Sequence, residues 1–257
     1  MKRFYLLLFI FLLVACSADQ LAQDFTQKPS NTLEKHLSNE PTSEGECPPN
    51  TIIEWLDVVM IEDIQYEYYH PYPSNDNSTI AMEKGRELGE VTYKMAEQAC
   101  TDYQIKNGDA AYLEIGTKVY EIKGYPTNFI VSADERAYIV TENKQAKTVG
   151  ELYPMQAFVK NIYIQSEEDG KRLHTFSEAN RDRFLSIISE LPLENIDSLY
   201  EDGKFEGDRV FLEIELDNGI TFSQLYWSDT NTFHLGAIGN EEIKQIIDSE
   251  IINMNES

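Results

Sequence analysis

The sequence predicts an α+β fold, in which a mainly antiparallel β domain (a small barrel or sandwich) precedes a β-α-β-β-β-α domain. Three observations favour it. Short runs rich in β-branched and aromatic residues, separated by turn residues, fill 50–149. Helical patterns with capping signals appear within 150–257. Between these helical patterns lies a strictly alternating apolar run that ends at an Asn-Gly turn.

The N-terminus is typical of an export signal. Lys2 and Arg3 precede an unbroken apolar run over 4–13, and Leu13-Val14-Ala15-Cys16 follows. The apolar run is shorter than the roughly 20 residues that span a bilayer, so a signal peptide over 1–15 is favoured over a transmembrane helix. The stretch resembles the signal peptide and lipobox of a bacterial lipoprotein.

This resemblance implies that Cys16 carries a lipid and becomes the first residue of the mature chain. Each buried methylene adds about 0.8 kcal/mol, so two acyl chains such as palmitate hold a protein at a membrane where one does not. We therefore expect a lipid anchor on the extracytoplasmic face of the cell membrane. The alternative is an ordinary cleaved signal with a chance cysteine. Many Lys, Ile and Asn residues favour a Gram-positive source.

Residues 16–49 read as a flexible tether, because they are polar and contain Pro29, Pro41, Pro48 and Pro49. Outside the cytoplasm disulfides persist, and Cys47 and Cys100 are the two cysteines left after Cys16. Their pairing would close a loop of about 54 residues and stabilise the fold by about 4 kcal/mol. Two free buried thiols are the alternative.

The β domain begins with strands over 52–69 and a loop rich in breakers over 70–77. The segment 83–100 fits a helix or a strand, and Gly85 and Gly89 favour a strand from about Leu88.

Four short strands then form a predicted meander. The first pair is 111–115 with 118–122, and the second is the hairpin 129–132 with 137–141 around Ala133-Asp134-Glu135. Within it, 113–125 resembles a segment of uncharacterised lipoproteins of Bacillus-type bacteria. That resemblance implies only an exported lipoprotein of unknown role, with no catalytic residue.

The second domain starts with a strand over 158–165 and an acidic turn. A capping box from Thr175 to Glu178 opens a helix, which Pro192 ends. The buried face of that helix comprises Phe184, Ile187, Ile188 and Leu191.

Apolar residues alternate over 210–216, which predicts a strand whose Glu213 and Glu215 face water. Asn218-Gly219 predicts a type I′ turn into a strand over 220–227, and a third strand follows over 233–238. Asn240 caps the last helix, whose buried stripe comprises Ile243, Ile246, Ile247 and Ile251.

The chain is strongly acidic, with a formal net charge of −24. Cleavage would remove Lys2 and Arg3, which leaves 19 basic against 45 acidic residues and a charge of −26. Nucleic acid, anionic lipid head groups and anionic wall polymers are therefore disfavoured as partners.

No pattern predicts a catalytic residue, a cofactor or a metal. The four histidines lack metal-ligand spacing, no Gly-x-Ser-x-Gly elbow occurs, and the acids at 167–169 do not match a calcium loop. One candidate binding surface stands out, because aromatic side chains on a loop can hold a sugar ring or a proline-rich peptide. Its residues are Tyr66, Tyr68, Tyr69 and Tyr72. Alternatively, these rings pack at the sheet surface.

Together these features predict a noncatalytic binding module held at the cell surface by its lipid. Its partners would be the membrane, through the anchor, and an unknown protein or cell-wall component. The alternatives are a cell-wall-modifying hydrolase that uses acidic residues and a regulator of a membrane-embedded partner.

Overall fold

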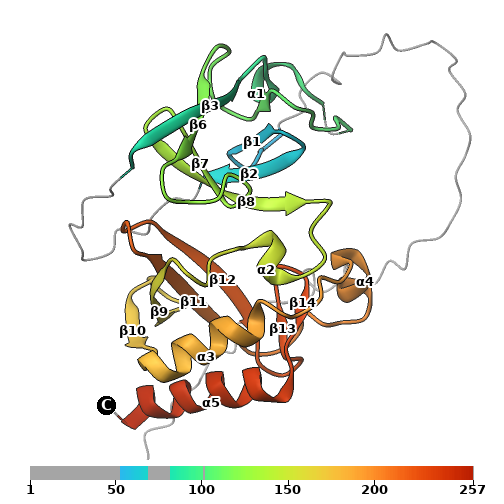
Figure 1. Cartoon of the computed structure of the whole chain (residues 1–257). Coiled ribbons are helices and arrows are strands. Elements are labelled where there is room, and N and C mark those ends of the chain that lie inside the picture. The colour runs from blue at the N-terminus through green and yellow to red at the C-terminus, as the bar shows by residue number, and fades with distance from the viewer. Residues whose placement is uncertain (1–52, 69–81, 101, 257) are drawn as a thin grey trace, which may run out of the picture. The chain divides into compact units, whose positions relative to one another are not determined.

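Two β-sheets and five helices make up the part of the chain that the computed structural model describes, residues 53–68, 82–100 and 102–256 (Figure 1). The predicted α+β class is confirmed. The first sheet is a curled half-barrel of eight strands, in the order β3-β6-β7-β8-β2-β1-β5-β4. The second sheet has six strands, in the order β10-β9-β11-β12-β13-β14.

The first sheet is antiparallel except where β4 pairs with β5. The strands predicted over 52–69 are present and pair as a hairpin, and the hairpin predicted across 129–141 is confirmed. The strands are β1 (Val58–Ile61), β2 (Ile64–Tyr68), β3 (Lys84–Glu90), β4 (Tyr93–Lys94), β5 (Asp109–Ala110), β6 (Lys118–Ile122), β7 (Ile130–Ala133) and β8 (Arg136–Asn143).

Two hairpins of this sheet turn through residues with positive φ. Glu62 and Asp63 have φ of 52° and 63°, and Asp134 and Glu135 have φ of 49° and 59°. Positive φ at both central positions is the mark of a type I′ turn, whose twist matches that of the strands. Asn107 supports the first turn, since its side chain accepts from Asp63 N and donates to Asp63 Oδ1, each at 2.7 Å.

The predicted strand over 111–115, and its hairpin with 118–122, are wrong. The strand β5 ends at Ala110, and Ala111 lies between two other segments: its N–H donates to Val58 O, and its carbonyl accepts from Ala96 N in helix α1 (Met95–Gln98). These backbone bonds bind Ala111 to β1 and α1, so β6 pairs with β3 and β7 instead.

The ambiguous segment 83–100 contains both kinds of structure. A strand is present, as predicted, but it begins at Lys84 and not near Leu88, and it ends at Glu90. Helix α1 follows near the end of the segment, where Met95 turns its side chain into the core at 2% exposure.

The second sheet contains the predicted strands over 158–165, 210–216 and 220–227. The predicted third strand over 233–238 is wrong, because a turn at Gly236 (φ 92°) divides it in two. The strands are β9 (Val159–Gln165), β10 (Arg172–Thr175), β11 (Arg209–Leu216), β12 (Thr221–Trp227), β13 (Thr232–Phe233) and β14 (Ala237–Ile238).

The hairpin between β11 and β12 is confirmed, but its type I′ turn is wrong. Gly219 has φ of 85°, whereas Asn218 is not among the residues with positive φ. Gly219 N donates to Leu216 O at 2.9 Å, and Asn218 Oδ1 accepts from Ile220 N at 3.1 Å. The Asn218 side chain therefore closes an ordinary turn, and only Gly219 enters the left-handed region.

The remaining helices are α2 (Val149–Leu152), α3 (Glu178–Ile188), α4 (Ile196–Glu201) and α5 (Glu241–Glu256). The sequence did not predict α2 and α4. The predicted cap Asn240 of α5 is confirmed, since its Oδ1 accepts from Ile243 N. The capping box at Thr175 is wrong, because Thr175 belongs to β10 and pairs with Tyr163 of β9. Ser177 caps α3 instead.

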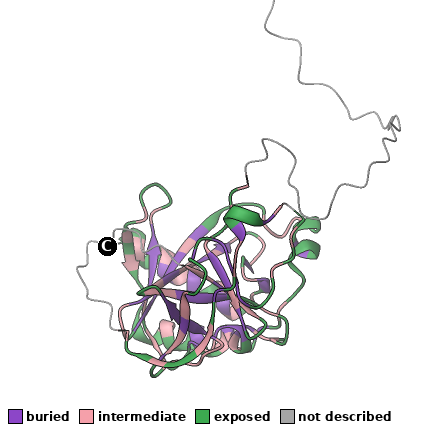
Figure 2. Cartoon of the chain, turned by 90° about the horizontal axis from the view of Figure 1, so that it is seen from above, coloured by how far each residue is buried: buried purple, intermediate pink, exposed green. Residues whose placement is uncertain are grey.

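Helices α3 and α5 lie together against one face of the second sheet (Figure 1). All described residues belong to one compact unit, Glu44–Ser257, whose buried residues gather in its interior (Figure 2). Side chains from both sheets enter this core: the rings of Phe129 and Phe222 lie 6.0 Å apart between centroids. The two sheets fall on either side of residue 150, the predicted boundary between the domains 50–149 and 150–257.

Within the described residues, no helix has the length and apolar character to cross a bilayer. The predicted signal peptide over 1–15, the tether over 16–49 and the loop over 70–77 lie outside the described residues.

Candidate functional site

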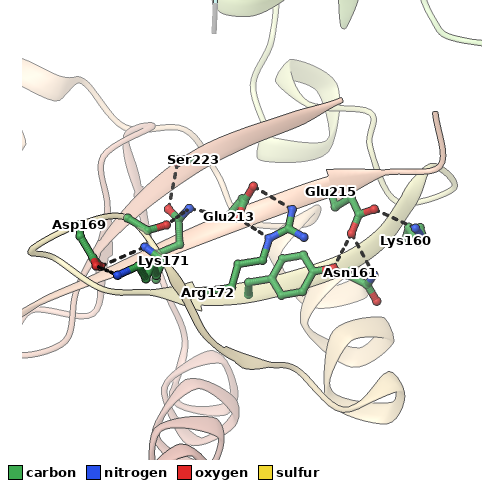
Figure 3. Close-up of polar contacts among 11 residues, drawn as sticks. Lys160, Asn161, Asp169, Lys171, Arg172, Glu213, Glu215 and Ser223 are labelled. Carbon is green, nitrogen blue, oxygen red and sulfur yellow. Dashed lines mark hydrogen bonds and ion pairs between the residues drawn. The ribbon is translucent and has the colours of Figure 1, made fainter. Parts of the chain in front are cut away.

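The candidate site is the polar face of the second sheet, the face opposite α3 and α5 (Figure 3). Side chains alternate across a strand, so β11 sends Leu212 and Ile214 into the core and Glu213 and Glu215 to the polar face. The register places residues of the neighbouring strands on that same face. They are Asn161, Tyr163, Gln165, Arg172, Thr221, Ser223, Leu225 and Trp227, and Phe211 of β11 lies on this face as well.

The two glutamates of this face are buried, and the prediction that they face water is wrong. Glu213 is 2% exposed and Glu215 is 3% exposed. Long polar side chains from β9 and β10 lie over them (Figure 3). The alternation of apolar and acidic residues separates the two faces of β11, but it carries no information about what covers the polar face.

Arg172 holds Glu213 at two points. Its Nε donates to Oε2 at 2.8 Å, and its Nη2 donates to Oε1 at 3.0 Å. Gln165 adds a third hydrogen bond to Oε2 at 3.0 Å. The hydrogen bonds to Glu213 raise the pKa of the Arg172 guanidinium, against the opposing effect of burial. A two-point contact between a guanidinium and a carboxylate is among the stronger polar interactions in proteins.

Glu215 is held by three neighbours. Lys160 Nζ donates to Oε1 at 2.8 Å, Asn161 donates to Oε2 at 3.0 Å, and the Tyr163 hydroxyl donates to Oε2. Burial alone would raise the pKa of this carboxyl, but the hydrogen bonds from Asn161, Lys160 and Tyr163 outweigh burial and lower it. Glu215 is therefore a fixed anion at neutral pH.

Tyr163 connects the two halves of this network. Burial, followed by its hydrogen bond to Glu215, raises the pKa of the phenol to about 12. The Arg172 guanidinium lies over its ring, 3.9 Å from the centroid, in a cation–π contact. The two ion pairs thus form one layer across β10, β9 and β11.

An aromatic cluster borders the layer on the β12 side. The ring of Phe205 lies 4.9 Å from that of Trp227, and the exposed His234 ring lies 6.0 Å from both. Phe211 and Leu225, between the cluster and the ion pairs, are partly exposed. The polar face thus offers rigid charges and apolar side chains on one surface.

Comparison with protein-family models, curated proteins and solved structures finds no match.

Two of the four tyrosines of the predicted binding surface, Tyr66 and Tyr68, lie within the described residues. Tyr66 is 2% exposed, and its hydroxyl donates to Thr127 O at 2.7 Å, so its ring is not open to a ligand. Tyr68 is half-buried beside Tyr138, with ring centroids 5.7 Å apart. Tyr69 and Tyr72 lie outside the described residues.

Cys100 is disulfide-bonded. The other two cysteines, Cys16 and Cys47, lie outside the described residues, so the pairing with Cys47 and the lipid on Cys16 stay predictions.

The acidic turn after β9 is occupied by internal ion pairs. Glu167 pairs with Arg209, and Asp169 pairs with Lys171. No group of three or more metal-ligating side chains converges anywhere in the described ranges.

A further buried carboxylate, Glu250 of α5, was not predicted from the sequence. It is 0% exposed. Its Oε2 lies 2.6 Å from His174 Nε2, and its Oε1 accepts hydrogen bonds from Ser177 Oγ at 2.9 Å and Asn180 Nδ2 at 2.6 Å. The hydroxyl and the imidazole both contact the carboxylate. The cluster therefore fastens α5 to β10 and to the first turn of α3. The available signal was the position of Glu250 within the apolar stripe of α5.

Proposed function

We propose that this chain is a lipid-anchored extracytoplasmic protein that binds a protein or a cell-wall component, without catalysis, through the polar face of its second sheet. The N-terminal pattern ending at Cys16 supports the anchor. The ion-pair layer supports binding, and it is the observation on which the proposal depends.

The layer suits recognition because its charges are fixed in place before any partner arrives. Arg172 and Glu213 are joined at two points, and Glu215 has three donors. Preorganised polar groups beside partly exposed apolar side chains, here Phe211 and Leu225, are a recurrent composition of interfaces.

The same geometry favours binding over acid hydrolysis. A general acid at neutral pH needs a carboxyl whose pKa is raised. The pKa of Glu215 is lowered, and Glu213 is engaged by Arg172 and Gln165. Glu215 is therefore not prepared to give a proton to a substrate, and the oxygens of Glu213 are already occupied by other donors.

The anchor is tested by Cys16→Ala. We expect this variant to lose incorporation of labelled fatty acid and to leave the membrane fraction, whereas Cys100→Ser should keep the label. Unchanged labelling of Cys16→Ala would refute the anchor.

The binding role is tested by photocrosslinking on intact cells. A photoreactive amino acid at Leu225 or Phe211 should give a discrete crosslinked product. The same residue at Ile252, which is 57% exposed on α5, serves as the control and should not give this product. Equal products from all three positions would contradict binding through the polar face.

The rival hydrolase is tested in parallel. The purified full chain is incubated with wall and peptide substrates, and Glu213→Gln and Glu215→Gln are compared with it. Turnover that either substitution abolishes would overturn the noncatalytic role, and we expect none.

A further inference from the structure

Helix α4 and the edge strand β14 expose three large apolar side chains. Ile196 is 47% exposed, Tyr200 is 75% exposed and Ile238 is 37% exposed. A solitary exposed apolar residue needs no explanation, but a group at one place does. We call these three residues the α4 patch.

The helix and the strand lie next to each other (Figure 1). Glu194 N, just before α4, donates to Gly236 O, just before β14, at 2.7 Å. A Cβ built on Gly236 would lie 3.2 Å from Ile196 Cγ1. Ile196 and Tyr200 are four residues apart, so they share one side of the helix.

The α4 patch is held by an ordered element. Asn195 Oδ1 accepts from Ser198 N at 2.8 Å as the N-cap, and Leu199 anchors the opposite side of the helix in the interior at 4% exposure. Beyond the helix, Lys204 N donates to Leu199 O at 2.9 Å. The exposure of Ile196 and Tyr200 is therefore a property of the folded helix and not of a loose end.

Acidic side chains surround the patch. Residues 189–208 contain seven acidic residues and one lysine. Elsewhere in the described chain many acids pair with Lys or Arg, as Glu87 and Glu90 do with Lys118. Within the described ranges, no ion pair involves the exposed acids around α4. They are Glu194, Asp197, Glu201, Asp202 and Glu206.

We propose that the α4 patch is the docking site for a basic amphipathic segment of a partner protein. Apolar side chains of that segment would cover Ile196, Tyr200 and Ile238, and its Lys or Arg residues would meet the unpaired acids around them. Charge complementarity of this kind steers association and selects the partner. The inference goes beyond the proposed function, and it depends on neither the lipid anchor nor the polar face.

The test uses the full chain in nonionic detergent and a synthetic helical peptide of leucine, lysine and alanine with one apolar and one lysine face. Fluorescence anisotropy of the labelled peptide reports binding. The double variant Ile196→Ser/Tyr200→Ser should bind about tenfold more weakly, since truncated central apolar contacts cost about 1.4 kcal/mol or more. The matched control Ile115→Ser/Ile252→Ser removes two side chains of similar exposure, each 57%, and should bind as the parent does.

A second pair of variants separates charge from apolar contact. Asp197→Asn/Glu201→Gln keeps the patch but removes two charges, so it should weaken binding and reduce its dependence on salt. Glu168→Gln/Glu178→Gln removes two exposed charges elsewhere and should change neither.

The outcomes distinguish the two proposals. Equal weakening by patch and control variants, no weakening by either, or equal binding of the peptide with every lysine replaced by glutamate would overturn docking at the α4 patch. Each of these results leaves the crosslinks from Leu225 and Phe211 as a separate measure of the proposed binding role.

Discussion

Arg172 on the edge strand β10 reaches across β9 to form a two-point ion pair with Glu213 on β11, at 2.8 and 3.0 Å. Its guanidinium passes over the ring of Tyr163 on the way. One side chain thus covers a buried carboxylate two strands away. The short strand β10 stays on the sheet partly through this contact.

Arg172→Met should destabilise the fold by about 3–5 kcal/mol, because it leaves the Glu213 carboxylate buried with its charge partner removed. The free energy of unfolding in urea measures the loss. The double variant Arg172→Met/Glu213→Leu should recover part of it, because no charge then remains buried.

Arg183→Met is the control for this prediction. Arg183 pairs with Glu242 on exposed parts of α3 and α5, and such surface pairs contribute about 0–1 kcal/mol. A loss for Arg172→Met no greater than that for Arg183→Met would contradict the structural role of the ion-pair layer.

Glu250→Ala should release the start of α3 from α5. The buried carboxylate accepts from the Ser177 N–H and hydroxyl and from Asn180, so its removal takes away the acceptor that these donors share. We expect a loss of about 3 kcal/mol or more in the free energy of unfolding. Asp248→Ala, which removes only a partly exposed i,i+4 pair with Lys244, should cost far less.

Acid should unfold the protein in part through Glu250. Burial opposes its ionisation, but the hydrogen bonds from His174, Asn180 and Ser177 outweigh burial and lower its pKa below the ordinary value of a glutamate in the folded state. A carboxyl with a lowered folded-state pKa stabilises the fold above its unfolded-state pKa of about 4.3, and this contribution is lost as pH falls through the folded-state pKa.

Unfolding of the parent and of Glu250→Gln between pH 7 and pH 2 measures this effect. The parent should lose stability more steeply than the variant below about pH 4.5, so that their difference shrinks in acid. Parallel curves would show that Glu250 takes no part in the acid response.

The sequence predicted those elements whose pattern is local. The hairpin between β11 and β12 has strict alternation and an Asn-Gly pair, and α5 has a cap and an apolar stripe. Prediction failed where distant segments decide the structure. Ala111 is bound by the backbones of Val58 and Ala96, and neither contact leaves a trace in the residues around 111.

Contacts between distant segments also explain why the burial of the candidate site was not predicted. Glu213 and Glu215 alternate with apolar residues, as side chains facing water do, and only β10 and β9 turn that face into a buried layer. Strand β10 was itself missed, because Thr175 and Ser177 both suit a helix cap and local sequence does not choose between them. The pairing of Thr175 with Tyr163 places Thr175 in a strand and leaves Ser177 as the helix cap.

The disulfide of Cys100 should stabilise the fold. If Cys47 is its partner, as predicted, the mass of the alkylated protein should rise by two labels only after reduction, and Cys47→Ser should abolish that difference. Reduction should lower the free energy of unfolding by about 4 kcal/mol, because the closed loop of about 54 residues no longer restricts the unfolded chain. Because the bond acts mainly on the unfolded chain, the hydrogen bond from Ala99 N to Met95 O in α1 should persist in the reduced protein. Hydrogen exchange at Ala99 that becomes immediate on reduction would instead show that the disulfide holds α1 in place.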